Sequence, residues 1–484
     1  MSDLDVLVIG GGISGLVTAW RLARQGLSVE VWERGERPGG KISTTRKDGY
    51  VTERAASMVM NFRPEITRFL EDSGAGVHKA LSAPMARRYL VSGGRLRSIP
   101  GKLAAAIACA PFSRRGRARL LLEPFVPKGG HEDETVSAFV RRRFGNELLE
   151  GAMDPFIAGT LSSDPDRASA HAVLPRLTAL EARYGSIAMG VIVNKLLRRK
   201  TAMPNETFSF AGGMGALVEW LAATPGVGFR AGAAVTGLTR MQDGWRVEAR
   251  SSDCEVSVSA RHVVLCTPAG IAAHLVGPAD ADLQTLLSGI DYAPLSVVHL
   301  GFSKSDIDHP LDGAGFLSPR REGLSINGCL WPSSLFTGRA PAGKALLSCY
   351  LGGARNPAAA AWDDARSIDA ALASIGPLLG IRGPAEMVRI DRHRRALPLY
   401  HGRYIARLRE IDRRLAAHPG LHLEANYKGG VSVRDRILCA LRTADRIEAE
   451  LGATAKSYCD RPIRDEARRP AFAGAQPAAL MDGA

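Results

Sequence analysis

The sequence predicts an α/β fold, α+β when all of its parts are counted, that begins with a Rossmann-like βαβ unit. Three observations predict this unit. A β-rich run over 4–9 ends in the turn Gly-Gly-Gly-Ile-Ser-Gly over 10–15, a helical apolar period fills 16–23, and a second β-rich run covers 28–32. Strand, tight turn, helix and strand in this order are typical of dinucleotide-binding domains.

The residues of the glycine-rich turn have separate expected roles. Gly10 allows the sharp turn, Gly12 leaves no Cβ between the backbone and a pyrophosphate, and Gly15 lets the helix approach the strand. The first helical residues, Ile13 and Ser14, would offer their free amides to the phosphates. The turn therefore predicts a phosphate-binding site.

A second glycine pair indicates which dinucleotide binds. Glu33, at the end of the second strand, would accept hydrogen bonds from ribose hydroxyls, which favours FAD or NAD over a 2′-phosphorylated cofactor. The segment after it begins at Arg34 and brings Gly39, Gly40 and Lys41. That arrangement resembles flavoproteins of the glutathione-reductase and amine-oxidase type, in which a second turn approaches the pyrophosphate. FAD is therefore the expected cofactor.

Length and composition restrict the kinds of protein that this chain can be. With 484 residues, 45% of them hydrophobic, the chain can bury a large core and is expected to form two or three domains. Its seven cysteines are scattered and form no CxxC pair, which argues against a disulfide framework or a zinc site and favours a reducing compartment. No metal is expected. The histidines considered show no metal-ligand spacing, and they are His78, His131, His171, His299, His393 and His401.

Other features of the sequence bear on location and partners. No signal peptide is expected, because the N-terminus carries Asp3 and Asp5 and leads straight into the first strand. The longest apolar stretches have about a dozen residues, short of the ~20 that span a bilayer. These points predict a cytoplasmic protein. The formal net charge of +14 is expected to reflect a well-solvated exterior, and no nucleic-acid partner is expected.

The rest of the chain is predicted to alternate between mixed, helical and β-rich parts. A helix that begins near Ser367 is expected to stop at Ile375, because glycine and proline follow. The segment 154–165, with two Asp-Pro steps, is expected to be a long irregular loop. The other expected elements are hairpins at 44–53 and 86–99, helices at 64–72, 135–144, 147–153, 216–223 and 433–451, and strands at 233–266, 295–302, 315–317, 325–331 and 345–351.

Two segments stand apart by composition. Residues 103–109 are small and apolar, and arginines cluster at 114–119. This pattern suits a helix that lies in a membrane interface, although arginine-rich faces are also common on other helices. The last stretch, 460–484, is rich in arginine, proline and alanine without periodicity, and we expect it to be disordered.

Several motifs carry a resemblance to one family. In their order and spacing they resemble the oxygen-dependent protoporphyrinogen oxidases, FAD enzymes that aromatise a porphyrinogen late in haem or chlorophyll synthesis. The resemblance extends from Leu4 to about Leu451. The motifs are DPFIAGT over 154–160 followed by Asp164-Pro165, FSFAGGM over 208–214, APLSVV over 293–298, Arg339-Ala340-Pro341, LPLY over 397–400 and NYKGGVSV over 426–433.

The resemblance implies a structure in three parts. A discontinuous FAD-binding domain would comprise 1–85, 205–285 and 396–459. A β-rich substrate-binding domain would comprise 86–101 and 286–395. A helical domain, 102–202, would rest on a membrane surface, the inner face for a cytoplasmic protein. The resemblance is also compatible with a homodimer.

The resemblance implies residues that bind substrate. Arg88 resembles the family's arginine that pairs with a substrate propionate, and Leu300, Leu317 and Phe336 resemble the apolar residues that sandwich the macrocycle. A flat apolar ring system needs aliphatic and aromatic walls, and its carboxylates need a fixed cation, best a guanidinium. The alternatives are core packing for the three apolar residues and a surface salt bridge for Arg88.

Further residues are implied in the same way. Gly159 and Thr160 lie in the family's loop that lines the substrate cavity. Val431, Ser432 and the N-terminus of the following helix would face the flavin pyrimidine, where the helix dipole favours negative charge. The additional implied FAD contacts are Val235, Asn426, Gly430 and Val433.

The chain departs from the family pattern in four places. These are Ala55-Ala56-Ser57-Met58, Ser162-Ser163, Ala314 and Glu424-Ala425. The last concerns chemistry most, because a carboxylate close to the flavin would oppose the negative charge that accumulates on reduction. Glu424 therefore either turns outward and pairs with an arginine or alters the flavin chemistry.

The implied activity is oxidation of protoporphyrinogen IX to protoporphyrin IX in three two-electron steps, with O2 as acceptor and H2O2 released. Because the flavin carries this chemistry, no catalytic side chain is expected. One alternative is oxidation of coproporphyrinogen III, with Arg87, Arg95 and Arg97 available for additional carboxylates. Others are a flavin-free protein that binds tetrapyrrole, suggested by the departures, and an oxidase of another apolar amine or pyrrolic metabolite.

Overall fold

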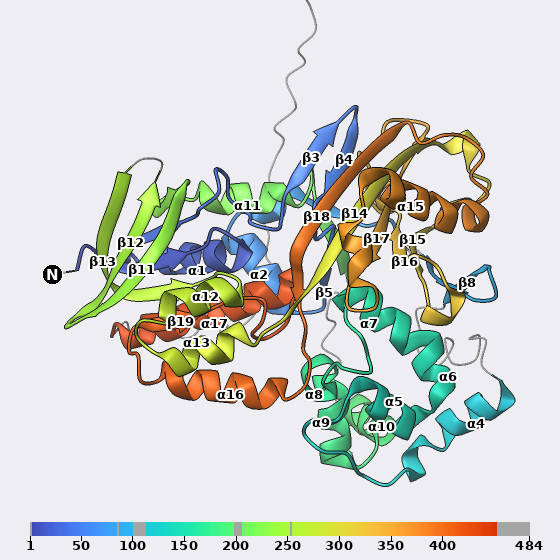
Figure 1. Cartoon of the computed structure of the whole chain (residues 1–484), viewed down its shortest axis with the longest axis horizontal. Coiled ribbons are helices and arrows are strands. Elements are labelled where there is room, and N and C mark those ends of the chain that lie inside the picture. Colours follow the sequence, from blue (N-terminus) through green and yellow to red (C-terminus); the bar gives the residue numbers. More distant parts are fainter. Residues whose placement is uncertain (1, 85–86, 100–112, 198–205, 252–253, 453–484) are drawn as a thin grey trace, which may run out of the picture.

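The computed structural model describes residues 2–84, 87–99, 113–197, 206–251 and 254–452. Figure 1 shows a sheet flanked by helices beside the N-terminus, a second sheet with one long helix over it, and a group of helices below the second sheet. Strands from distant parts of the chain share a sheet, so the chain passes between these parts repeatedly.

The first sheet contains the βαβ unit predicted from the sequence. β1, β2, β10, β13 and β19 pair in parallel, whereas β11, β12 and β13 pair antiparallel. The strand order is β10 (Val227–Arg230), β2 (Val29–Trp32), β1 (Leu4–Ile9), β13 (Cys254–Leu265), β12 (Gly244–Ser251) and β11 (Ala233–Met241), with β19 (Leu421–Leu423) beside β13.

Helices cover both faces of this sheet (Figure 1). On one face, α1 (Ile13–Ala23) and α17 (Val433–Glu450) pack against Val6, Val8 and Val264. The other face packs against three helices, which are α12 (Ala269–Val276), α13 (Ala281–Ser288) and α16 (Tyr404–Leu415). Burial of both faces explains the continuous apolar runs over 6–9 in β1 and 263–265 at the end of β13.

The second sheet joins a hairpin from early in the chain to strands from its second half. Its order is β18 (Met387–Pro398), β14 (Tyr292–Ser303), β17 (Lys344–Gly352), β16 (Ile326–Leu330), β15 (Gly313–Leu317), β7 (Arg87–Val91) and β8 (Leu96–Ile99). These elements include the strands and the hairpin predicted for this region.

The helix that covers the second sheet is longer than predicted. α15 runs over Asp364–Leu379 and continues through Pro377, although the sequence analysis ended it at Ile375. The Asp363 carboxylate caps its start by accepting a hydrogen bond from the Arg366 amide at 2.8 Å. Its apolar side packs on the sheet, and this burial outweighs the one backbone hydrogen bond that proline removes.

The helical part also corrects one prediction. Residues 154–161 form α7 (Asp154–Leu161) and not an irregular loop. The π-helical turn before it leads directly into α7, because Met153 is itself helical, so Pro155 is accommodated within one continuous helical run. Ile157 and Ala158 pack into the core of this part. The other helices are α4 (Arg114–Leu121), α5 (Val136–Phe144), α6 (Asn146–Leu148), a π-helical turn Leu149–Met153, α8 (Ala170–Val173), α9 (Pro175–Tyr184) and α10 (Ile187–Leu197).

Two small sheets and three helices connect the larger parts. The predicted hairpin is present as β3 (Thr44–Lys47) and β4 (Tyr50–Glu53). The other small sheet has the order β5 (Val59–Asn61), β9 (Glu206–Phe210) and β6 (Lys79–Leu81), and the helices are α2 (Pro64–Asp72), α11 (Gly215–Ala222) and α14 (Pro332–Leu335).

Some expectations fall outside the part of the chain that the structure describes. These are the apolar segment 103–109 and the tail 460–484. Within the described ranges, no helix combines the length and the apolar character that a bilayer crossing requires. The described cysteines are free thiols.

Candidate active site

The glycine-rich turn between β1 and α1 requires glycine at two positions and leaves space at a third. Gly10 has a φ of +111°, and a Cβ there would lie 3.0 Å from the Cys266 carbonyl oxygen. A Cβ on Gly15 would overlap the Gly10 carbonyl oxygen, so any side chain would push α1 away from β1. A Cβ on Gly12, by contrast, would meet nothing within 4 Å. This open space adjoins the N-terminus of α1.

The start of α1 has amides available for a ligand. Gly12 is the N-cap residue, and no side chain of the described residues caps the helix there. The first helical residues, Ile13 and Ser14, are themselves buried. An uncapped helix N-terminus facing open space favours an anion such as a pyrophosphate.

Glu33 organises the turn from the end of β2. Its carboxylate accepts hydrogen bonds from the amides of Gly11 at 2.7 Å and Gly35 at 2.8 Å. Its carbonyl accepts one from the Ala233 amide at 2.9 Å, which places the start of β11, and with it half-buried Val235, beside β2. Arg34 is exposed. A carboxylate held here is near the turn, as a group that accepts from ribose hydroxyls must be.

The second glycine pair touches the first turn, as the sequence predicted. The Gly39 amide donates to the Gly11 carbonyl at 2.8 Å. Gly40 has a φ of +58°, and a Cβ there would lie 3.5 Å from the Gly12 Cα. The two glycine turns therefore border the same open space.

Lys41 follows directly and is largely buried. Its Nζ donates to the Ala396 carbonyl of β18 and lies 5.4 Å from the centroid of the Tyr292 ring. Burial lowers the pKa of Lys41 to about 8. The Tyr292 hydroxyl is 3.5 Å from the Asn426 Oδ1, so Asn426 and Lys41 both adjoin Tyr292. A buried ammonium without a carboxylate partner among the described residues suits an anionic ligand.

The loop after Asn426 leads into the N-terminus of α17. Ser432 is the N-cap, and its Oγ accepts from the Asp435 amide at 3.1 Å, as the capping spacing predicted. Gly430 has a φ of +109° and, like Val431, is half-buried, whereas Val433 packs into the core behind the helix. The positive end of a long helix thus points from this loop.

Glu424 lies inside the protein and is paired. Its Oε1 accepts from Arg436 at 2.9 Å, its Oε2 accepts from the Thr443 hydroxyl at 3.1 Å, and Ser14 also hydrogen-bonds to it. Burial raises the pKa of Glu424, while Arg436 opposes this shift. The expected outward orientation is wrong, but the expected pairing with an arginine is present. Because Arg436 balances the carboxylate, Glu424 adds no net negative charge here.

One face of the second sheet carries Arg88 and Leu317, and we call it the Arg88 face. Leu317 in β15 lies opposite Leu90 in β7, two residues after Arg88, so both side chains project to the same side. The Arg88 guanidinium is exposed and lies 3.8 Å from the Met60 sulfur of β5. No carboxylate of the described residues lies within ion-pair distance of it.

Leu300 lies on the other side of that sheet. Leu317, Gly328, Tyr350 and Val297 form one row across the strands, and Leu300, three residues from Val297, projects to the opposite face. Leu300 is fully buried in the core beneath α15. The structure thus supports core packing for Leu300, in disagreement with the expected place beside Leu317.

The other residues expected to contact substrate also differ in position, since some adjoin the Arg88 face or solvent and one is buried. A Cβ on Gly159 would overlap the Leu317 Cδ2, so α7 packs on the Arg88 face and Gly159 permits the close approach. Thr160 is exposed, and its hydroxyl donates to the Phe156 carbonyl at 2.6 Å. Phe336 is only 3% exposed and lies below the Arg339 guanidinium, 5.5 Å away.

The structure also shows the surroundings of the other residues that depart from the family pattern. Ser57 hydrogen-bonds to Tyr350, whose side chain lies on the Arg88 face. Ser162 has a φ of +51°, a conformation that favours glycine. Ser163 lies 3.0 Å from the His401 Nε2. Ala314 accepts a hydrogen bond from the Trp331 amide at 2.9 Å through its carbonyl.

A comparison with protein families decides the assignment. The model described as "Flavin containing amine oxidoreductase" matches residues 13–448. The chain belongs to this family. It is an FAD-dependent oxidoreductase, and the two glycine turns, Glu33, Lys41 and the N-terminus of α17 are the parts that fit FAD.

Individual relatives of this flavin amine oxidoreductase extend the comparison. Protoporphyrinogen oxidase 2 of Arabidopsis thaliana is 29% identical, over 92% of this chain and 94% of that protein. Coproporphyrinogen III oxidase of Bacillus subtilis is 27% identical, over 90% and 97%. A solved structure of a candidate protoporphyrinogen oxidase from Exiguobacterium sp. 255-15 has a TM-score of 0.76 at 23% identity, over 93% and 100%. The similarity to this solved structure shows the fold alone.

Sequence analysis assigned no role to two arginines of this flavoprotein. Arg434, in the first turn of α17, donates to the Met60 carbonyl at 3.1 Å and lies 4.0 Å from the centroid of the Phe62 ring. It therefore shares Met60 with Arg88, from the N-terminus of α17. Arg339 is buried and bonds Ser209 at 2.6 Å and Glu53 at 3.3 Å. Arg434 directly follows the NYKGGVSV motif and Arg339 begins the Arg339-Ala340-Pro341 motif, and these positions could have signalled a role for each.

Proposed function

We propose that this flavoprotein oxidises a porphyrinogen, with protoporphyrinogen IX as its substrate and O2 as the electron acceptor. The observation that carries the proposal is the position of Arg88. Its guanidinium is exposed, has no acidic partner among the described residues, and shares one sheet face with Leu317. A cation beside an aliphatic wall matches a carboxylated, largely apolar macrocycle.

The chain's own residues would bind and orient this substrate. Arg88 would hold a propionate at the edge of the sheet, while Leu317 and α7 at Gly159 would cover a ring face and exclude water. Met60 contacts both Arg88 and Arg434, so β5 connects this face to the N-terminus of α17. FAD bound at the glycine turns would supply the acceptor for two electrons at a time.

The distribution of arginines supports protoporphyrinogen over coproporphyrinogen, which has more carboxylates. Arg87 forms an ion pair with Asp312 at 2.9 Å and projects away from the Arg88 face, because it is the preceding residue in β7. Arg97 lies opposite Leu90 and so shares the face with Arg88, while Arg95 belongs to the hairpin turn. One additional arginine is fewer than two further propionates require.

Parallel substrate assays test the proposal. Purified protein should consume O2 and produce a fluorescent porphyrin with protoporphyrinogen IX, and should do so more slowly with coproporphyrinogen III. Faster turnover of coproporphyrinogen III would replace the proposed substrate with the second one. Absence of O2 consumption with either, in protein that carries FAD, would overturn the assignment to porphyrinogens.

Replacement of Arg88 tests the binding role directly. Arg88→Ala should mainly raise KM, because the contact lies far from the reacting carbon and a lost charge-assisted hydrogen bond costs about 1.5–3 kcal/mol. Arg88→Lys should recover part of this loss, since an ammonium lacks the planar fork. Arg95→Ala, a change in the same hairpin, is the control and should leave KM unchanged. Equal kinetics of Arg88→Ala and wild type would remove Arg88 from the site.

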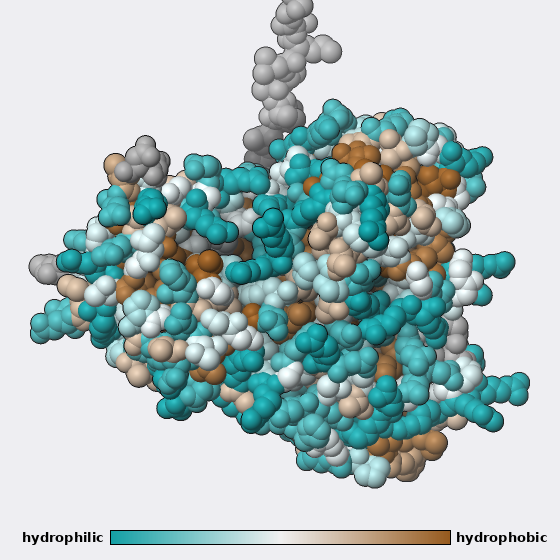
Figure 2. Space-filling model, viewed as in Figure 1, coloured by the Kyte–Doolittle hydropathy of each residue, from teal (hydrophilic) through white to brown (hydrophobic). Residues whose placement is uncertain are grey.

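We further propose that the helical part rests on a membrane surface. Figure 2 shows apolar side chains gathered at the end of the molecule where α4 and α10 lie in Figure 1. Phe125 is 81% exposed and Leu196 is 80% exposed. The arginines of α4 add positive charge that suits the anionic lipids of an inner membrane face. The expected homodimer stays a prediction.

A further inference from the structure

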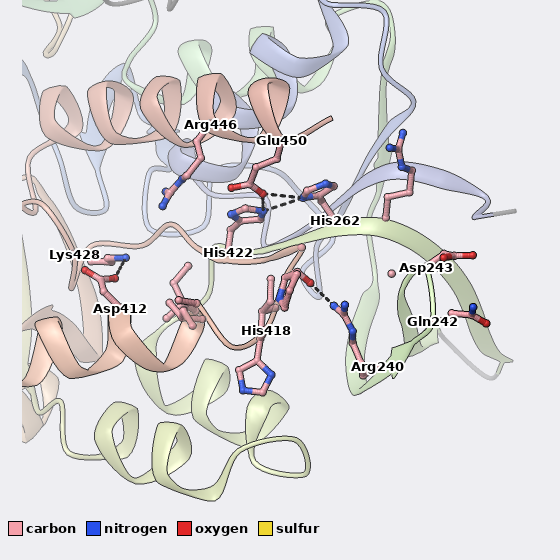
Figure 3. Close-up of a pocket in the computed structure, with 18 residues that line it drawn as sticks. Arg240, Gln242, Asp243, His262, Asp412, His418, His422, Lys428, Arg446 and Glu450 are labelled. Carbon is pink, nitrogen blue, oxygen red and sulfur yellow. Dashed lines mark hydrogen bonds and ion pairs between the residues drawn. The ribbon is translucent and has the colours of Figure 1, made fainter. Parts of the chain in front are cut away.

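A second site lies on the first sheet, away from the glycine turns. His262 in β13 and His422 in β19 project from neighbouring parallel strands, and Glu450 ends α17 above them (Figure 3). The two histidines are buried, with 8% and 6% of their surfaces exposed. His262 pairs with Val6, which lies near the start of β1, whereas the glycine turn follows the end of β1. The site and the glycine turns therefore lie toward opposite ends of the strand.

The three side chains direct one ligand atom each at a common point. The His262 Nδ1 and the His422 Nε2 are 3.0 Å apart, and the Glu450 Oε2 lies 3.6 Å from the former and 3.5 Å from the latter. A tetrahedral zinc ion with bonds of 2.0–2.1 Å holds its ligand atoms about 3.4 Å apart. The observed triangle therefore has the dimensions of one face of a zinc coordination shell.

A hydrogen bond alone accounts for only part of this arrangement. One neutral imidazole can donate to the other across 3.0 Å. The carboxylate oxygen is then too far from either nitrogen for a strong hydrogen bond, yet it faces both. A cation in place of the proton that the two imidazoles share would let all three atoms act as ligands.

The surroundings leave room for a fourth ligand. The three side chains line a cavity of about 930 Å³ between the sheet, α16 and the end of α17. Its cations are mostly engaged elsewhere, because Arg261 pairs with Asp5 at 3.3 Å and Lys428 pairs with Asp412. Arg446 also lines the cavity and would favour an anion or hydroxide in the open position.

We propose that His262, His422 and Glu450 bind a divalent transition metal, with Zn²⁺ the cation they fit best. Two imidazoles and one carboxylate are ligands that zinc accepts, and three protein ligands with one open position are a common zinc set. The metal would connect the C-terminal end of α17 to two strands of the sheet. It is a site separate from the flavin chemistry and does not depend on the porphyrinogen proposal.

Equilibrium dialysis against Zn²⁺ tests this site. Protein without a polyhistidine tag, stripped with a chelator and still loaded with FAD, is dialysed near neutral pH, and bound zinc is measured by elemental analysis. Wild type should take up one zinc per chain with saturation. His422→Ala and Glu450→Gln should each weaken that uptake more than about 100-fold, because a ligand matters more than the groups that orient it.

His418→Ala is the matched control. His418 lines the same cavity but pairs with Asp280 at 3.2 Å, so this variant should bind zinc as wild type does. Zinc should also raise the melting temperature of wild type and His418→Ala but not that of the two ligand variants. The exposed side chain of Glu450 makes Glu450→Gln a variant that folds even if His422→Ala does not. Absence of saturable uptake by wild type, or equal uptake by wild type and Glu450→Gln, would leave only an internal hydrogen bond and overturn the proposal.

Discussion

At the scale of single residues, Gly12 is a position where a side chain would block the cofactor without disturbing the fold. Its φ is −74°, which any residue adopts, and a Cβ there meets no atom within 4 Å. Gly12→Val should therefore fold normally and lose FAD, because its side chain fills the space for the pyrophosphate. The absorbance ratio of flavin to protein after purification measures this. Stoichiometric FAD in Gly12→Val would place the cofactor elsewhere.

Lys41 should make FAD binding depend on pH. Burial lowers its pKa to about 8, so in the cofactor-free protein Lys41 is charged below this pH and neutral above it. A nearby phosphate stabilises the ammonium, so binding above pH 8 takes up a proton, and the dissociation constant should rise with pH by up to about tenfold per unit.

The matched variant for this dependence is Lys41→Met. It should bind FAD more weakly at neutral pH, with a smaller slope above pH 8, because no group at position 41 then titrates. Isothermal titration at several pH values measures both constants. The same slope in wild type and Lys41→Met would assign the dependence to another group.

The role of a residue was predictable from the sequence where a single physical constraint decides which residue type can stand there. The backbone of Gly10 and the close contact at Gly15 leave no alternative to glycine, and both follow from the turn pattern. Leu300 was misplaced because an apolar residue in a β-strand suits a core as well as a ligand wall. Only the pairing register shows which face of the sheet it occupies.

At the scale of elements, the Glu424–Arg436 pair fixes α17 against β19. Both side chains are only 4% exposed, and their charged atoms lie 2.9 Å apart. Glu424→Gln would leave a buried guanidinium without a counter-charge, so we expect a loss of about 3–5 kcal/mol in the free energy of unfolding. Urea titration of the FAD-loaded protein measures it.

A surface pair supplies the comparison for this prediction. Glu410→Gln breaks an exposed pair with Arg413, whose side chain is 68% exposed, and should leave the free energy of unfolding nearly unchanged, because water screens the two charges. Replacing both Glu424 and Arg436 with uncharged residues should cost less than the two single changes added together. If Glu424→Gln were as mild as Glu410→Gln, the pair would not hold the helix.

Helix boundaries show where local rules gave way to packing. α15 passes the proline that should have ended it because its apolar side lies on the second sheet. The Asp-Pro step that suggested an irregular loop lies at the start of α7, inside a helical run that continues from the π-helical turn Leu149–Met153. Both errors came from treating proline as a break without knowing its position in the helix.

At the scale of the whole molecule, the order of strands explains what the sequence could not provide. The βαβ unit is local and was predicted in full, whereas the hairpin 87–99 reaches its sheet only through pairing with β15. The sites depend on such distant pairings. Sequence analysis expected no metal. His262 and His422 are 160 residues apart in sequence, so no local ligand spacing could have indicated the site that we propose for zinc.

The apolar end of the helical part should decide whether the molecule binds membranes. The buried carboxylate of Glu123 accepts a hydrogen bond from the Ile187 amide at 3.0 Å and so holds the turn before Phe125 against the start of α10. Phe125 and Leu196 therefore belong to one rigid unit and are both about four-fifths exposed, at 81% and 80%. Insertion of each side chain into lipid should contribute about 1.5–3 kcal/mol.

Co-sedimentation with vesicles that contain anionic lipid tests this. The double variant Phe125→Ser and Leu196→Ser should lower the bound fraction at least about tenfold in partition coefficient, because two apolar contacts are removed at once. Val77→Ser is the control, since Val77 is 78% exposed but lies beside α2, outside the helical part, so its loss should leave binding unchanged. Raising the salt concentration should weaken, without abolishing, the binding of wild type, because screening acts on the arginines of α4 and not on the apolar contacts. Equal sedimentation of wild type and the double variant, or an equal loss in Val77→Ser, would show that this end of the molecule does not contact the membrane.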